Sequence, residues 1–218
     1  MTARTRIKVC GMKDGAEANG LVAMGIDALG FIFVAASPRN IEPDKAREII
    51  ASLPPFVDAV GVFVDQELDV VNDIVRYCGL SMVQLHGNES PQYCEAVKCR
   101  VVKTFSLRPD TEPSETNPFY DPYLGIVSGF LVDTYHEKLA GGTGQVFDWE
   151  QLKKSRPAGP LILAGGLGPD NIGEAIRQVR PFAVDVNSGV EIAPGVKDIA
   201  KAEWLVATVR EADRLFCA

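Results

Sequence analysis

The sequence predicts an α/β protein, a single-domain (β/α)8 or TIM barrel with parallel strands. Eight short apolar runs rich in Val, Ile and Phe recur along the chain, roughly one strand–helix unit apart. Amphipathic stretches separate these runs, and another follows the last of them. The 218 residues are enough for eight such units in one domain. We therefore expect one catalytic domain over residues 1–218.

The strands are expected at the apolar runs, because strands of a parallel sheet are buried on both faces. In chain order they span Ile7–Cys10, Ala28–Phe33, Ala59–Val64, Met82–Leu85, Val101–Phe105, Gly129–Val132, Leu161–Ala164 and Phe182–Val186. An open nucleotide-binding sheet would carry a glycine-rich G-x-G-x-x-G turn after its first strand. The residues there are Cys10-Gly11-Met12, which favours the closed barrel.

The helices are expected in the amphipathic stretches between the strands. They span Asp14–Met24, Asp44–Ser52, Leu68–Cys78, Asp170–Arg177 and Asp198–Val209. Gly25 and Gly79 mark the ends of two of them, and Asp44 is a candidate N-cap. Between residues 108 and 128 four prolines interrupt any long helical pattern, so this helix is the weakest.

The composition excludes several classes of function. A net charge of −7 argues against a nucleic-acid partner, since phosphate binding needs a basic face. The apolar runs are shorter than the ~20 residues of a membrane helix, and the N-terminal segment has no apolar core like that of a secretory signal. The five cysteines are scattered and lack zinc spacing, so we expect reduced thiols, no metal and a cytoplasmic protein.

Glycines follow the last three predicted strands, at the end of the barrel where active sites lie. They stand in Gly141-Gly142-Thr143-Gly144, Gly165-Gly166 and Ser188-Gly189. Each alone could simply turn the chain, but glycine also lets backbone N–H groups approach an anion closely. Together they predict a phosphate site, which resolves how an acidic chain holds an anionic small molecule.

Cys10 and Asp133 end the first and sixth predicted strands, on opposite sides of the barrel. Cys10 could be a buried apolar residue, and Asp133 a helix cap or loop partner. Placed across a substrate, they could instead serve as general base and general acid. That role needs a thiolate at Cys10, which a following helix N-terminus would favour, and a protonated Asp133.

Two further side chains are candidates for substrate contact. Arg39, after Pro38, is either a solvated surface residue or the anchor of a substrate carboxylate, which suits its guanidinium group. His86 follows the fourth strand and is either structural or a substrate contact. His136, the other histidine, is expected to be solvated.

Strand alternation alone predicts one buried ion pair. In the first strand Ile7 and Val9 should face the helices, which turns Lys8 inward together with Cys10. In the last strand the same alternation turns Asp185 inward. Because the first and last strands of a closed barrel are neighbours, Lys8 and Asp185 should pair inside it.

The motifs at these strand ends resemble the phosphoribosylanthranilate isomerase family. The matching stretches run in the family's order over residues 7–198 and are Lys8–Met12, Ala28–Phe33, Ser37–Arg39, Gly61–Val64, Gln84–Glu89, Gly141–Gly144, Leu163–Leu167, Asp185–Glu191 and Pro194–Asp198. The cysteine after the first strand and Gln84-Leu85-His86-Gly87 are more specific than the glycine loops. Val9 and Asn187 depart slightly from the family's pattern.

The resemblance implies an Amadori rearrangement of N-(5′-phosphoribosyl)anthranilate in tryptophan biosynthesis, without metal or cofactor. It implies that Cys10 removes the C2′ proton and that Asp133 is the acid that opens the ribose ring. Arg39 would bind the anthranilate carboxylate. A phosphate site is implied at the loops with Gly142, Thr143, Gly144, Gly165, Gly166, Asn187, Ser188 and Gly189. The protein is expected to be a monomer or a homodimer.

Three other functions remain open at this point. A related histidine-pathway isomerase would use two aspartates, whereas the first position here is Cys10. A Schiff-base enzyme would use Lys8 or Lys103 as a free amine, and Lys8 already has an expected partner. A non-catalytic phosphate-binding module should have lost one member of the acid–base pair, and this chain keeps both.

Overall fold

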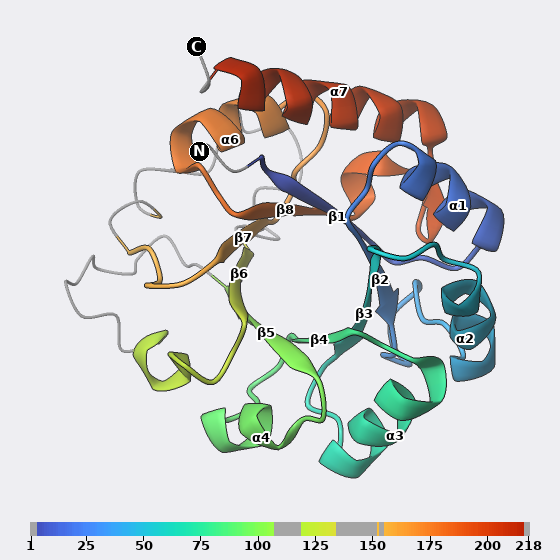
Figure 1. Cartoon of the computed structure of the whole chain (residues 1–218), viewed down its shortest axis with the longest axis vertical. Coiled ribbons are helices and arrows are strands. Elements are labelled where there is room, and N and C mark those ends of the chain that lie inside the picture. Colours follow the sequence, from blue (N-terminus) through green and yellow to red (C-terminus); the bar gives the residue numbers. More distant parts are fainter. Residues whose placement is uncertain (1–3, 107–118, 134–151, 153–154, 216–218) are drawn as a thin grey trace.

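The strands form a closed barrel of eight parallel strands in the order β1 to β8 (Figure 1). The computed structural model of the chain describes residues 4–106, 119–133, 152 and 155–215. The strands are β1 Arg6–Cys10, β2 Ala28–Ile32, β3 Asp58–Phe63, β4 Met82–Leu85, β5 Arg100–Ser106, β6 Gly129–Asp133, β7 Leu161–Ala164 and β8 Ala183–Val186. All eight expected strands are present, with ends within one residue of those predicted. The fold predicted from the sequence is confirmed.

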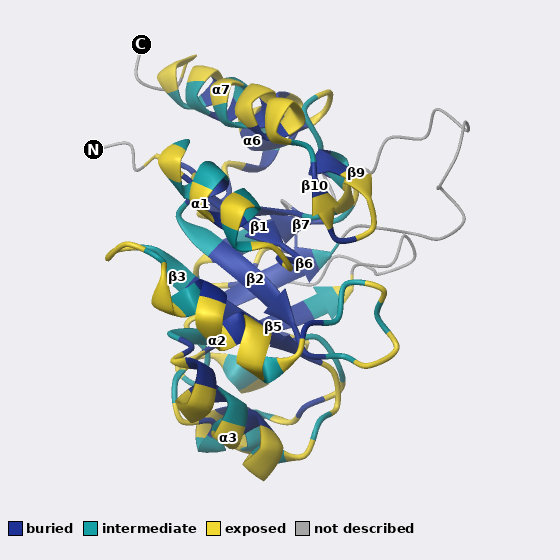
Figure 2. Ribbon diagram, turned by 90° about the vertical axis from the view of Figure 1, so that its right-hand side faces the viewer, coloured by how far each residue is buried: buried dark blue, intermediate teal, exposed yellow. Residues whose placement is uncertain are grey.

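The two faces of each strand take part in different layers. Ile7 and Val9 point outward into the large core between barrel and helices, as do Val184 and Val186. Inward-facing side chains form small clusters inside the barrel, one of which holds Cys10 with Ile32 and Val62. Figure 2 shows the buried strands in the interior and the exposed outer faces of the surrounding helices. This separation confirms the alternation on which the predicted ion pair depends.

The predicted pair between Lys8 and Asp185 is present inside the barrel. The two residues are directly opposite each other in the β1–β8 register. The Lys8 ammonium lies 2.8 Å from both oxygens of the Asp185 carboxylate. Both side chains are 8% exposed.

The helices pack around the outside of the barrel (Figure 1). They are α1 Gly15–Ala23, α2 Pro43–Ala51, α3 Leu68–Cys78, α4 Pro91–Ala96, α6 Ile172–Val179 and α7 Ile199–Leu215. Asp14 caps α1 by accepting hydrogen bonds from the N–H groups of Ala16 and Glu17. Gly25 follows the end of α1 with a φ of 89°, and Gly79 ends α3 in the left-handed region, as predicted.

Three helix predictions need correction. Asp44 is not an N-cap, because α2 begins at Pro43, whose fixed φ suits the first helical position. Helix α6 starts and ends two residues later than the predicted Asp170–Arg177, with Asn171 at its N-cap. The last helix runs to Leu215 rather than Val209, since Ala212 extends its buried face by one more turn.

The structure also contains short elements that the sequence did not predict. Ser90 is the N-cap of helix α4, and its hydroxyl accepts from the N–H of Tyr93. A two-stranded antiparallel hairpin follows β8, formed by β9 Glu191–Ala193 and β10 Val196–Lys197. One-turn 3-10 helices span Asp121–Tyr123 and Ser188–Val190. The first belongs to the proline-interrupted region, of which residues 108–118 lie outside the described part.

No helix among the described residues is long and apolar enough to cross a membrane. The four cysteines in the described part, Cys10, Cys78, Cys94 and Cys99, are free thiols.

Candidate active site

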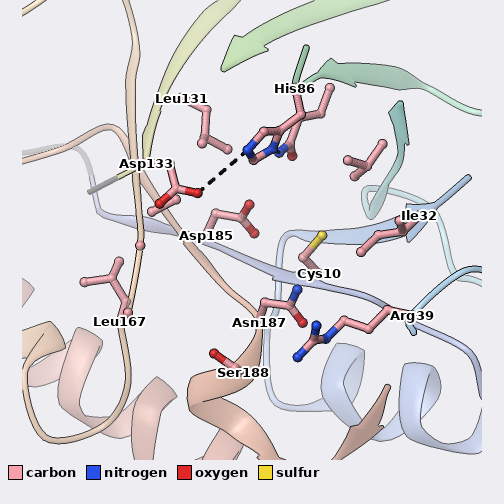
Figure 3. A pocket seen from close by; sticks show the side chains of 15 residues that line it. Cys10, Ile32, Arg39, His86, Leu131, Asp133, Leu167, Asp185, Asn187 and Ser188 are labelled. Carbon is pink, nitrogen blue, oxygen red and sulfur yellow. Dashed lines mark hydrogen bonds and ion pairs between the residues drawn. The ribbon is translucent and has the colours of Figure 1, made fainter. Parts of the chain in front are cut away.

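A pocket with a cavity of about 440 Å³ lies at the carboxyl ends of the strands. It is lined by Cys10, Ile32, Arg39, Val62, Gln84, His86, Leu131, Asp133, Ala164, Gly165, Gly166, Leu167, Asp185, Asn187 and Ser188. The structure thus brings together eight of the predicted site residues. Figure 3 shows the Cys10 sulfur and the Asp133 carboxylate on opposite sides of this pocket, with Asp185 between them.

Cys10 is the last residue of β1, and its side chain points into the barrel mouth. The residue is 4% exposed. Burial raises the pKa of the thiol, Asp185 adds to that rise, and the ammonium groups of Lys8 and Lys197 oppose it. The expectation that a helix N-terminus favours the thiolate is therefore wrong, because α1 begins only at Gly15 and burial outweighs the nearby positive charges.

Asp133 ends β6 and lies beside His86, which follows β4. The His86 Nε2 is 3.8 Å from an Asp133 carboxylate oxygen (Figure 3). The other ring nitrogen of His86 lies 3.3 Å from the side-chain nitrogen of Gln84. Burial lowers the pKa of His86, so the imidazole is neutral at pH 7. His86 thus presents a polar but uncharged edge beside the carboxylate.

Arg39 is held by a carboxylate that the sequence interpretation did not include. Its Nε lies 3.0 Å and its Nη2 2.7 Å from oxygens of Glu191. The side chain is 20% exposed and lines the pocket, so it is not a solvated surface residue. Glu191 takes one edge of the guanidinium group, which fixes the orientation in which Arg39 meets a ligand.

Lys197 completes this cluster beneath the pocket. Its ammonium donates to Glu191 at 2.8 Å and to the side-chain oxygen of Asn187 at 3.1 Å. Burial works against the Glu191 carboxylate, but hydrogen bonds from Arg39 and Lys197 outweigh it and lower its pKa to about 2. The hairpin β9–β10 supplies both Glu191 and Lys197. The Pro194-Gly195 dipeptide, which begins the last matching stretch, was the signal that could have indicated the turn of this hairpin.

The loop after β7 turns tightly at the pocket wall. Gly165 and Gly166 have φ values of 96° and 60°, a conformation that other residues rarely adopt. Asn171 stabilises this loop, because its side chain accepts from the N–H of Gly168 and donates to the carbonyl of Gly166. Backbone groups of this loop therefore have a fixed position at the mouth.

The remaining predicted glycines differ in their placement. Gly189 is not among the pocket-lining residues; it packs against the backbone of Leu167 and Gly168, where a Cβ would lie 2.0 Å from the Leu167 carbonyl oxygen. Its substrate contact stays a prediction. Gly142, Thr143 and Gly144 lie outside the described residues, as does His136.

The arrangement suits proton transfer on an anionic substrate. A thiol and a carboxyl group face one pocket from opposite sides, and a fixed guanidinium group and glycine turns provide places for anions. Among the described residues, no group of three or more His, Cys, Asp or Glu side chains is placed to hold a metal ion.

Comparison with known proteins adds independent information. Residues 7–208 match the family described as N-(5′-phosphoribosyl)anthranilate (PRA) isomerase. A relative named N-(5′-phosphoribosyl)anthranilate isomerase, from Geobacter sp. strain M21, is 47% identical over 95% of this chain and 98% of its own length.

Two solved structures are similar over nearly the whole fold. The phosphoribosyl anthranilate isomerase of Thermus thermophilus is 35% identical with a TM-score of 0.82, covering 95% of this chain and 99% of that one. A second structure of such an isomerase is in complex with reduced 1-(o-carboxyphenylamino)-1-deoxyribulose 5-phosphate. It is 35% identical with a TM-score of 0.80 and covers the same shares of both chains.

Proposed function

The chain belongs to the N-(5′-phosphoribosyl)anthranilate isomerase family, and we propose that it performs the family's rearrangement with Cys10 as general base and Asp133 as general acid. It is an isomerase of tryptophan biosynthesis acting on a phosphorylated small molecule. The observation that carries the residue assignment is the position of these two groups across one pocket (Figure 3).

The chemistry needs one proton donated and one removed on the same sugar. Asp133 protonates the ring oxygen of the ribose, the bond from this oxygen to C1′ breaks, and the anthranilate nitrogen stabilises the open form as an iminium ion. The Cys10 thiolate then takes the C2′ proton. The electron pair of the C2′–H bond forms a C1′=C2′ double bond, and the π pair of the iminium group returns to nitrogen. The enol then gains a proton at C1′ and loses the proton of its C2′ hydroxyl group, which gives the ketone product. The reaction moves hydrogen within the substrate and needs no redox cofactor.

The substrate has a carboxylate at one end and a phosphate at the other. Arg39, oriented by Glu191, suits the carboxylate, because its remaining guanidinium edge can donate in plane. The phosphate suits the loops after β7 and β8, with Gly165, Gly166, Asn187 and Ser188 at the pocket wall. The neutral His86 suits a hydrogen bond to the sugar beside Asp133.

We also propose that the chain acts as one catalytic domain in the cytoplasm and, of monomer and homodimer, as a homodimer. Residues of β1 to β4 and of β6 to β8 line the same pocket, which supports a single domain. The Phe56 side chain is fully exposed with a φ of 70°, a costly arrangement for a bulky apolar residue that a second copy could cover. Light scattering on the wild type and Phe56→Lys tests this, with a dimer that the substitution weakens as the expected result.

The function is tested by following the loss of phosphoribosylanthranilate fluorescence with the purified protein. Wild-type turnover is expected, and Cys10→Ala and Asp133→Asn should each lose about 10²–10⁴ in rate. The folded state of each variant is checked by circular dichroism. An inactive wild type, or two fully active variants, would refute the assignment.

A further inference from the structure

We propose that the Lys8–Asp185 ion pair controls the charge of Cys10, with the Lys8 ammonium stabilising the thiolate and the Asp185 carboxylate limiting that stabilisation. Lys8 would then be a positioning residue that acts through Cys10, in addition to holding the barrel together. The proposal rests on the proposed role of Cys10 as the base.

The strand geometry places the three groups together. Lys8 stands two residues before Cys10 on β1, so both side chains point into the barrel. The register opposes Lys8 to Asp185 on β8, with the Lys8 nitrogen 2.8 Å from both carboxylate oxygens. Asp185 also lines the pocket that contains Cys10 (Figure 3).

Gly30 on β2 shows how close the thiol and the ammonium are. It is the register partner of Cys10. A Cβ atom added to Gly30 would lie 2.7 Å from the Cys10 sulfur and 3.1 Å from the Lys8 nitrogen. The Cys10 sulfur and the Lys8 nitrogen therefore both lie next to Gly30, in space that a larger side chain at this position would occupy.

The charges around the thiol act in opposing directions. Burial raises the pKa of Cys10; Lys8 is the largest opposing influence, and Asp185 reinforces the rise. Burial also works against the charge of Lys8, but Asp185 and Cys10 outweigh it, so the pKa of Lys8 is raised and the ammonium stays charged. Lys197, which faces Cys10 from the hairpin side, also lowers the pKa of the thiol. Lys8 and Asp185 are thus one ion pair with opposite effects on Cys10.

This opposition separates the proposal from a purely structural role. Lys8→Met and Asp185→Asn both break the same pair, so stability falls in both variants. If the pair also controls Cys10, the thiol should titrate at a higher pH in Lys8→Met and at a lower pH in Asp185→Asn. A charge within about 4–6 Å shifts a pKa by roughly 1–3 units, so each midpoint should move by about 1 unit or more.

The experiment titrates the ultraviolet absorbance of the Cys10 thiolate in the full chain. The absorbance of each variant is compared with that of the same variant carrying Cys10→Ala, so that the contribution of the other cysteines is subtracted. Arg100→Met is the matched control, because it breaks the Arg100–Asp58 pair at the opposite end of the barrel and should leave the midpoint unchanged. Shifts in the same direction, or no shift in either variant, would overturn the proposal.

Two further measurements keep the outcome decisive. If Lys8→Met does not fold, two variants still test the proposal. Lys8→Arg should keep the thiol midpoint near that of the wild type, and Asp185→Asn must lower it. A midpoint that stays the same or rises in Asp185→Asn overturns the proposal. The pH dependence of kcat/KM is measured in parallel, and its acidic limb should follow the thiol midpoints. A fully active Cys10→Ala would refute the proposed function, whereas an inactive Cys10→Ala with unmoved midpoints would refute this inference alone.

Discussion

Single buried charges determine the chemistry at the mouth of this barrel. The Glu191 carboxylate accepts hydrogen bonds from Arg39, from Lys197 and from the N–H of Gly195, so its negative charge is paired within the protein. This arrangement fixes a guanidinium group at the pocket of a chain whose net charge is −7. The binding of an anionic substrate therefore depends on local contacts and not on a basic surface.

At the same scale, the buried pair of Lys8 and Asp185 should matter for stability far more than any exposed pair. Lys8→Met leaves a buried carboxylate without its partner and should lower the free energy of unfolding by about 3–5 kcal/mol. Chemical denaturation measures this. Lys45→Met is the control, since the Lys45–Glu48 pair is exposed and should contribute at most about 1 kcal/mol. Equal effects of the two substitutions would contradict the assignment of a buried pair.

At the scale of elements, the site is assembled by short segments that follow β7 and β8. The loop after β7 is stabilised by Asn171 and packs against Gly189 in the turn after β8. The hairpin β9–β10 then brings Glu191 and Lys197 under Arg39 and Asn187. The strands of the barrel bring Cys10 and Asp133 to the pocket, and these short segments orient Arg39 and Asn187 beside it.

Gly189→Ala tests the contact between the two loops. The added methyl group would overlap the Leu167 carbonyl, so the loops must separate and the proposed phosphate site should be displaced. We expect KM for the phosphorylated substrate to rise by about tenfold or more, which corresponds to roughly 1.4 kcal/mol of lost binding. Steady-state kinetics measure it, with Gly20→Ala as the control because a Cβ there has its nearest neighbour at 3.6 Å. An unchanged KM would show that Gly189 does not position the loop.

At the scale of the whole molecule, the sequence predicts what depends on periodicity. The recurrence of eight strand–helix units predicted the barrel. Alternation along the first and last strands, which closure of the barrel makes neighbours, predicted the inward Lys8–Asp185 pair. The six-residue helix α4 and the hairpin β9–β10 were missed, since such short elements have no readable period. The direction of the Cys10 pKa was also missed, because it depends on burial and on charges from β8 and β10 that are distant in sequence.

The acid stability of the fold follows from Glu191. Its pKa is about 2 in the folded protein, against an ordinary value of 4.5. The carboxylate therefore stays ionised to a lower pH in the folded state than in the unfolded chain. Its contribution to stability is therefore complete above about pH 4.5 and is lost as the pH falls toward 2. Denaturant unfolding across this window should show a smaller loss of stability in Glu191→Gln than in the wild type. Glu203→Gln on the exposed face of α7 should behave like the wild type.

The central claim is that Cys10 removes the C2′ proton of the substrate. The most direct measurement is a single-turnover experiment with excess enzyme and substrate carrying deuterium at C2′, because product release then does not limit the rate. The wild type should react more slowly with the deuterated than with the ordinary substrate, and Cys10→Ala should lose about 10²–10⁴ in the rate of this step. A Cys10→Ala variant that converts both substrates at the wild-type rates would contradict the account.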